Sequence, residues 1–195
     1  MNKITAFRLG IKIFGSMLLA GVTGVFLGLV FVGFGEAVWI RVIIQSIMLL
    51  LYYMLIYNTV WRDGFLEKNR VQCAFSVFDP LKGLKAGLYA VVPSYALWAL
   101  MVALSPFHVN LDGIYRFLHF FAIDIINAFM QPNLPLQEHS FGQLLASTCF
   151  LAAIPVLCGV GYLLGYKRFS FTEVFIFKKK AKALTKEEAA KIRKQ

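Results

Sequence analysis

Residues 13–34 read IFGSMLLAGVTGVFLGLVFVGF, a run without a single charged side chain. A helix needs about 20 apolar residues to cross the hydrocarbon core of a bilayer, and this run is long enough. It is longer than the hydrophobic region of a secretory signal peptide, so we expect an uncleaved first membrane span. Three more apolar runs follow it, at 42–60, 86–104 and 144–164. The sequence therefore predicts four membrane spans.

The composition agrees with a membrane protein and excludes several other classes. Of the 195 residues, 59% are hydrophobic and 15% are charged, whereas soluble domains are about 45–50% apolar and about 25% charged. An ordinary cytosolic enzyme, a disordered chain and a coiled coil are therefore excluded. The net charge of +10 would suggest nucleic acid for a soluble protein. In a membrane protein basic cytoplasmic loops explain such a charge, so we expect no nucleic-acid partner.

The basic residues predict the orientation of the spans. All of them except Arg41 and Arg116 lie in the N-terminal tail, in the connection 62–85, or after Leu164. With four spans, these three regions lie on one side of the membrane, whereas a fifth span would divide them. The positive-inside rule therefore favours four spans with both termini in the cytoplasm. We expect a single bundle over 1–177 in the cell membrane, followed by a basic cytoplasmic tail over 178–195.

The inner face is predicted to contact anionic lipid headgroups, which attract basic residues near the surface. Asp79 and Pro80 predict the start of the third helix, as N-cap and first helical residue. Lys82 and Lys85 would then extend along the helix toward lipid phosphates. Residues 62–70, between the second and third apolar runs, are expected to form a loop.

The segment 114–131 is apolar but contains charged and polar side chains, and composition alone does not decide whether it crosses. The orientation argument places it on the outer side, as an interfacial or re-entrant helix. The predicted fold class is therefore an all-α integral membrane protein, with four transmembrane helices and one outer amphipathic or re-entrant helix.

A polar stripe on this outer helix is the main candidate binding site. On a helical wheel, five polar residues fall within about 50–60° of one line: His108, Asp112, Arg116, His119 and Asn127. Three interpretations compete. The stripe faces water on the membrane surface, or it lines a polar cavity between the spans. Alternatively, His108, Asp112, His119 and His139 form a metal or acid–base site, although the charge of Arg116 opposes a divalent cation.

Arg41 and Gln45, one turn apart at the outer end of the second run, support the cavity interpretation. A charge close to the bilayer usually faces the bundle interior and has a partner. Asp124 lies among apolar residues of the outer segment and needs such a partner. We therefore expect Arg41 and Asp124 to interact. If the pair is buried, removing one member would cost about 3–5 kcal/mol.

Small residues predict close helix packing in the first and last spans. Ala20, Gly24 and Gly28 recur every four residues, as do Gly161 and Gly165. Residues at this spacing form a groove that another backbone can approach closely. Packing within one chain is favoured over homodimerisation, because a four-helix bundle needs such contacts internally.

No nucleophile, metalloprotease or nucleotide-binding motif is present. Cys73, Cys149 and Cys158 form neither a CxxC pair nor a cluster with histidine, so we expect no metal and no cofactor. The stretches GYLLGYK at 161–167 and DPLKGLKAGL at 79–88 resemble those of small uncharacterised bacterial polytopic membrane proteins, a resemblance that implies no activity. In size the chain is similar to the substrate-binding subunits of vitamin transporters, but those form six-helix bundles.

The function predicted from these features is non-enzymatic. We expect a small transport or accessory subunit that binds a solute, a membrane protein or a second copy of itself at its outer polar face. The alternative is a membrane-embedded enzyme that uses the outer histidines and acids.

Overall fold

The computed structural model describes residues 5–31, 38–107 and 109–169, and every regular element in these ranges is a helix. Four helices are long and apolar enough to cross a membrane. They are α1 (Ala6–Phe31), α2 (Val38–Gln72), α3 (Lys82–Leu104), and α6 (Phe141–Ala146) continued by α7 (Cys149–Tyr166). Large apolar side chains such as Phe26 and Leu50 are 66% and 60% exposed on them, as expected of surfaces that face lipid. The all-helical fold with four candidate spans is confirmed.

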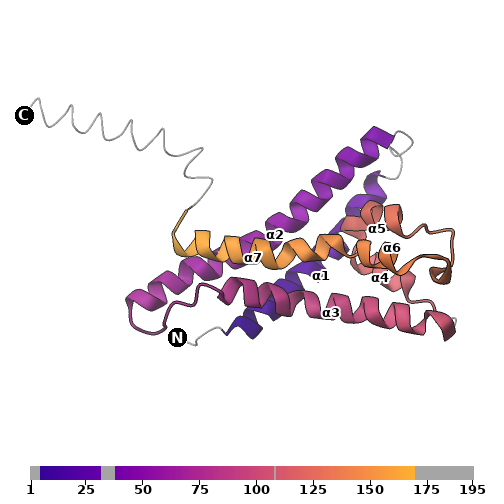
Figure 1. The fold of residues 1–195 in the computed structure, drawn as a ribbon. Helices are drawn as coiled ribbons and strands as arrows, with labels where there is room; N and C mark the ends of the chain where they lie inside the picture. The colour runs from indigo at the N-terminus through magenta and orange to yellow at the C-terminus, as the bar shows by residue number, and fades with distance from the viewer. Residues whose placement is uncertain (1–4, 32–37, 108, 170–195) are drawn as a thin grey trace, which may run out of the picture.

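The bundle has two different ends (Figure 1). The start of α1, the connection between α2 and α3, and the end of α7 lie at one end, which we call the α2–α3 end. The short helices α4 (Asp112–Leu118), α5 (Ile123–Phe129) and α6 gather at the opposite end, which we call the α4–α6 end. Between the ends, α1, α2, α3 and α7 share one core of fully buried apolar side chains, which includes Ile13, Ile56, Ala90 and Ile154.

Glycines let α7 pack directly on α2 and α3. A Cβ atom added at Gly165 would collide with the carbonyl oxygen of Trp61 in α2, and one at Gly161 would lie 3.1 Å from the Tyr57 ring. On the other side, a Cβ at Gly87 of α3 would lie 2.6 Å from the Cα of Pro155. The structure therefore places the Gly161–Gly165 pair in contacts within the chain.

The region 62–70 is helical, and the predicted loop there is wrong. α2 continues through it to Gln72, over 35 residues, which corresponds to about 52 Å at the rise of an α-helix. This length exceeds a hydrocarbon core of about 30 Å. The charged side chains do not end the helix, because several of them lie on one face and pair with each other and with α3.

The outer segment is not one helix. α4 and α5 are separated by a 3-10 turn at Phe120–Ala122, with non-helical backbone angles at His119 and Ala122. This break directs the side chain of Phe121 inward at the α4–α6 end of the bundle. Its ring stacks there on Tyr52 of α2, with centroids 3.4 Å apart. The segment is therefore packed between α1 and α2 rather than lying free on the surface.

Two helix starts differ in their capping. α3 begins at Lys82 with Leu81 as N-cap and no side-chain cap, so the predicted start at Asp79 and Pro80 is wrong. The Asp79 carboxylate instead accepts a hydrogen bond from the backbone N–H of Leu81 at 3.0 Å, in the turn before the helix. The last span begins at Phe141, where Ser140 and Gln143 form a reciprocal capping box. The helix is interrupted at Ser147 and Thr148 before α7 continues it.

Candidate functional sites at the two ends of the bundle

Arg116 brings three of the predicted stripe residues together at the α4–α6 end. Its Nε donates a hydrogen bond to Asp112 Oδ2 at 2.6 Å, and its Nη1 donates to the side-chain oxygen of Asn127. Its Nη2 donates to the carbonyl oxygen of Met130 at 2.9 Å. The guanidinium therefore connects α4 to the end of α5. Because each of its three nitrogens donates one of these bonds and its charge is paired with Asp112, Arg116 helps to fix the shape of the site.

A polar hollow lies beside this cluster. It is bounded by the end of α3, the start of α4 and the loop before α6, and its lining includes Ser105, Asn110, Asp112, Leu134 and Gln137. The buried Oδ1 of Asp112 has no hydrogen-bond partner among the described residues. The side-chain oxygen of Asn110 accepts from the Asp112 backbone N–H at 3.0 Å. The lining thus contains a carboxylate and side-chain amides, whose oxygens suit a cation or a hydrogen-bond donor.

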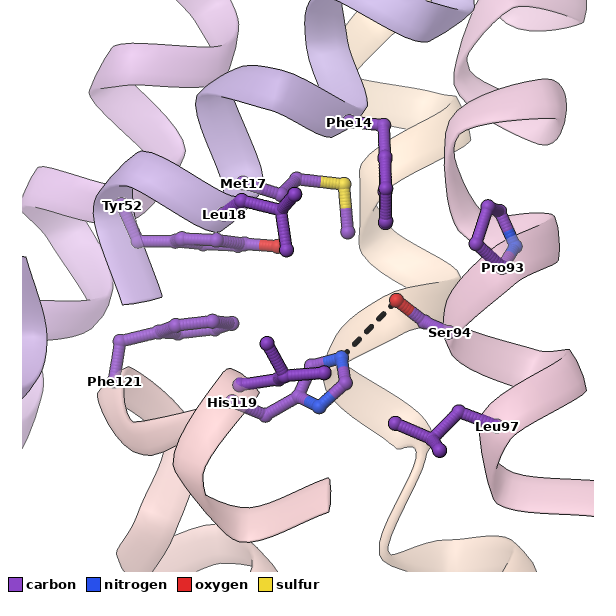
Figure 2. Close-up of a pocket in the computed structure, with 10 residues that line it drawn as sticks. Phe14, Met17, Leu18, Tyr52, Pro93, Ser94, Leu97, His119 and Phe121 are labelled. Carbon is purple, nitrogen blue, oxygen red and sulfur yellow. Dashed lines mark hydrogen bonds between the residues drawn. The ribbon is translucent and has the colours of Figure 1, made fainter. Parts of the chain in front are cut away.

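His119 turns away from the stripe into the core. Its Nδ1 donates to the carbonyl oxygen of Tyr115 at 2.9 Å, so its Nε2 accepts from the Ser94 hydroxyl at 3.1 Å (Figure 2). The side chain is 3% exposed. Burial lowers the pKa of the imidazole, although the bond to Tyr115 opposes the shift, and this keeps the ring neutral at pH 7.

The residues of the metal hypothesis are not assembled. His139 has a local role, because its Nε2 accepts a hydrogen bond from the Gln131 backbone N–H at 2.9 Å and its Nδ1 donates to Pro135. His108 lies outside the described residues. Within the described ranges, no group of three histidine, cysteine or acidic side chains is arranged to hold a metal ion.

Gln45 and Asp124 attach the outer segment to α2. The Gln45 amide is buried and donates a hydrogen bond to the carbonyl oxygen of Phe121. Partial burial raises the pKa of the Asp124 carboxyl, and the positive charge of Arg41 opposes this rise. The structure thus brings Arg41 close enough to act on Asp124. Both side chains belong to exposed residues, so the large energy expected of a buried pair does not apply.

The small residues of α1 receive the outer segment. A Cβ atom at Gly21 would lie 2.5 Å from the Leu118 carbonyl oxygen, and one at Gly24 would lie 3.3 Å from the Phe121 backbone nitrogen. A Cβ at Gly28 would collide with the Phe120 ring, while Ala20 is buried in the core. The predicted groove is therefore filled by the 118–121 turn of the same chain.

A cluster of four buried charges at the α2–α3 end was missed by sequence reasoning. Lys82 Nζ lies 3.1 Å from Asp63 Oδ2 and 3.0 Å from Glu67 Oε2, and Arg70 Nη1 lies 2.9 Å from Glu67 Oε2. Each of the four residues is at most 6% exposed. Lys82 therefore does not reach toward lipid phosphates as expected. It joins the first turn of α3 to α2, and its ammonium lies 5.7 Å from the ring centroid of Tyr162 in α7.

The sequence does contain a signal for this cluster. Asp63, Glu67 and Arg70 are spaced at i, i+4 and i+7 and share one face of a helix. This helical spacing goes unnoticed when residues 62–70 are expected to form a loop. The exposed neighbour Lys85 behaves differently, since it pairs with Asp79 at 3.0 Å and half of its side chain remains accessible.

Comparison with known proteins adds no assignment to this geometry. No family model matches the chain, and neither a curated protein nor a solved structure is significantly similar to it.

Proposed function

We propose that this chain is a non-enzymatic, multi-pass protein of the cell membrane that binds a solute or a protein partner at its α4–α6 end, as a small transport or accessory subunit. The observation that carries the proposal is the polar hollow beside Arg116. Its carboxylate and amide groups are held in place by hydrogen bonds between α4, α5 and the neighbouring loops. A protein partner could be another membrane protein or a second copy of this chain.

We further propose that the α2–α3 end faces the cytoplasm and the α4–α6 end faces outward. Support comes from the positive-inside rule, because exposed Arg8, Arg62, Lys85 and Lys167 all belong to the α2–α3 end. These residues would contact anionic lipid headgroups. The basic tail over 178–195, which lies outside the described residues, would add to this inner charge.

The alternative of a membrane-embedded enzyme has weaker support. Such an enzyme would need the outer histidines close to Asp112, with ring nitrogens available for proton transfer. His119 and His139 instead use both ring nitrogens in hydrogen bonds to neighbouring groups. Binding is therefore the function that the described geometry supports best.

Site-directed photocrosslinking in intact cells tests the binding site. A photoreactive amino acid at Val109 or Leu134, which line the hollow, is expected to form a discrete adduct. The same amino acid at Leu100, exposed on α3 away from the hollow, is the matched control and should give only lipid adducts. Asp112→Asn should weaken the adduct from 109. Identical adducts from all three positions, or no adduct from the hollow, would count against the proposal.

Thiol labelling tests the orientation separately. With Cys149 and Cys158 replaced by alanine, the exposed native Cys73 at the α2–α3 end should resist an impermeant thiol reagent in intact cells. Single cysteines placed at the N-terminus, within 62–70 and after 180 should also resist it. A cysteine at 135, in the loop before α6, should react. Labelling of Cys73 from outside would refute the proposed orientation and leave the hollow itself unaffected.

A further inference from the structure

A second, smaller cavity lies where the 118–121 turn meets the bundle. It has a volume of about 30 Å³ and is lined by α1, α2, α3 and this turn. Most of its lining is apolar, with Phe14, Met17 and Leu18 on α1 and Phe121 from the outer segment (Figure 2). Leu18 is 37% exposed, and Pro93 on α3 is exposed as well. Since both belong to helices that are apolar enough to span a membrane, the side of the cavity that they line would face hydrocarbon in a bilayer.

Three buried polar side chains from three different elements line this cavity (Figure 2). They are Tyr52 of α2, Ser94 of α3 and His119 at the end of α4, and they are 1%, 4% and 3% exposed. The Tyr52 hydroxyl has no hydrogen-bond partner in the part of the chain that the structure describes. Figure 2 shows this hydroxyl projecting into the cavity, toward the side from which Ser94 and His119 approach. A buried hydroxyl without a partner is unfavourable, so the cavity favours an occupant that can hydrogen-bond to it.

The hydrogen bonds of His119 define what this occupant can offer. Because Nδ1 carries the proton given to Tyr115, Nε2 must accept the proton of Ser94. Ser94 Oγ therefore keeps only its lone pairs for a ligand and acts as an acceptor. The Tyr52 hydroxyl can still donate. The two groups together match a ligand oxygen that both accepts and donates a hydrogen bond, which a hydroxyl does and an ether or a carbonyl does not.

We propose that this cavity binds the terminal hydroxyl of an apolar, lipid-soluble alcohol, which enters from the bilayer between α1 and α3. The volume suits a single polar end group, since a cavity of about 10–15 Å³ already holds one water-sized oxygen. The hydrocarbon part of the ligand would remain between Leu18 and Pro93, in contact with lipid. Water is the other source of an oxygen with this chemistry. The apolar mouth favours the alcohol, and the experiment separates the two.

Photolabelling of the full chain in phosphatidylcholine vesicles tests the proposal. The probe is a long-chain primary alcohol with a diazirine close to its hydroxyl group, and its methyl ether is the matched control probe. We expect the alcohol to label the lining residues Phe14 and Met17 roughly threefold to tenfold more than the ether, because only the alcohol can donate a hydrogen bond to Ser94 Oγ. Ser94→Ala, which removes this acceptor, should reduce the preference. Tyr52→Phe removes a donor that both probes can use, so it should weaken labelling by the alcohol and by the ether alike.

Tyr53→Phe is the control variant, because the neighbouring Tyr53 hydroxyl donates to the Phe150 carbonyl oxygen at 2.9 Å and is not part of the cavity. It should leave the labelling by both probes unchanged. Ser94→Ala and Tyr52→Phe lie on different helices, so either one gives a test if the other does not fold. Equal labelling by alcohol and ether, or labelling that neither Ser94→Ala nor Tyr52→Phe changes, would overturn the proposal. So would radiolytic oxidation of buried Met17 without alcohol labelling, because this result would identify the occupant as water only.

Discussion

The two ends of the bundle differ in how their charged side chains are paired. At the α2–α3 end, two acids and two bases are buried together, so each of the four charges has an opposite charge within 3.6 Å. At the α4–α6 end, Arg116 donates to one carboxylate, one amide and one backbone carbonyl, and one buried oxygen of Asp112 has no hydrogen-bond partner among the described residues. The first arrangement pairs every charge with an opposite charge, although Asp63 Oδ2 and Arg70 Nε there also lack a hydrogen-bond partner. The second arrangement lies beside a hollow. The comparison indicates that the larger cluster fixes the fold and the smaller one is the better candidate for binding.

The largest effect is expected at the buried charges. Glu67→Gln leaves Lys82 and Arg70 with one carboxylate between them, and removing one partner from a buried ion pair costs about 3–5 kcal/mol. The double variant Glu67→Gln/Lys82→Met restores charge balance and should recover much of this loss. The free energy of unfolding, measured by denaturant titration in detergent micelles, reports both effects.

Lys85→Met is the control for this comparison. The Lys85–Asp79 pair is half exposed, and exposed pairs contribute about 0–1 kcal/mol. If Glu67→Gln is no more harmful than Lys85→Met, the buried cluster does not stabilise the fold and the contrast between the ends is lost.

A smaller effect is expected where α1 receives the outer segment. Gly24→Leu introduces a side chain against the Phe121 backbone and should cost about 1–3 kcal/mol by overpacking. We expect a loss of folded yield in size-exclusion chromatography rather than a change from dimer to monomer. Gly15→Leu on the same helix meets no atom within 4 Å of its Cβ and should be tolerated. A well-folded monomeric Gly24→Leu from a dimeric parent would show that the groove is a dimer interface instead.

Arg41 and Asp124 should show a coupling of about 1 kcal/mol or less, because both are exposed. Asp124→Asn alone should be close to neutral, since burial disfavours the ionised carboxylate. In an Arg41→Met background the same change should be stabilising, because the opposing positive charge is gone. A thermal-stability double-mutant cycle measures this coupling. Strictly additive effects would mean that Arg41 does not orient the outer segment.

The smallest effect concerns pH. The pKa of Asp124 is raised in the folded protein, so the folded state binds this proton more tightly than the unfolded state. Lowering the pH through the raised pKa should therefore add stability, and raising it again should remove this contribution. In Arg41→Met the gain should begin at a higher pH, and in Asp124→Asn it should be absent. Unfolding midpoints measured across the acidic range would detect it, and identical profiles for all three proteins would contradict the raised pKa.

Much of the fold could be predicted, because spanning helices follow from hydrophobic length alone. The runs 42–60, 86–104 and 144–164 each fall within one candidate span, and the first run does so as far as Val30. The candidate site was predicted in part. Asp112 and Arg116 pair one turn apart, as the spacing of the stripe suggested. Asn127 reaches Arg116 only because the helix is broken between them, and His119 turns away from the stripe at the same break.

The sequence by itself determined the helical class, the four apolar runs and the concentration of basic residues in three regions. These features depend only on composition and on the helical period of 3.6 residues, both of which can be read from the sequence alone. Only the tertiary structure decided that the 118–121 turn fills the glycine groove of α1 and that Lys82 joins Asp63 and Glu67 inside the bundle. Both outcomes depend on contacts between segments far apart in the chain. The second also depends on whether a buried charged side chain has an opposite charge beside it. Helical periodicity and composition carry no information about such long-range partners.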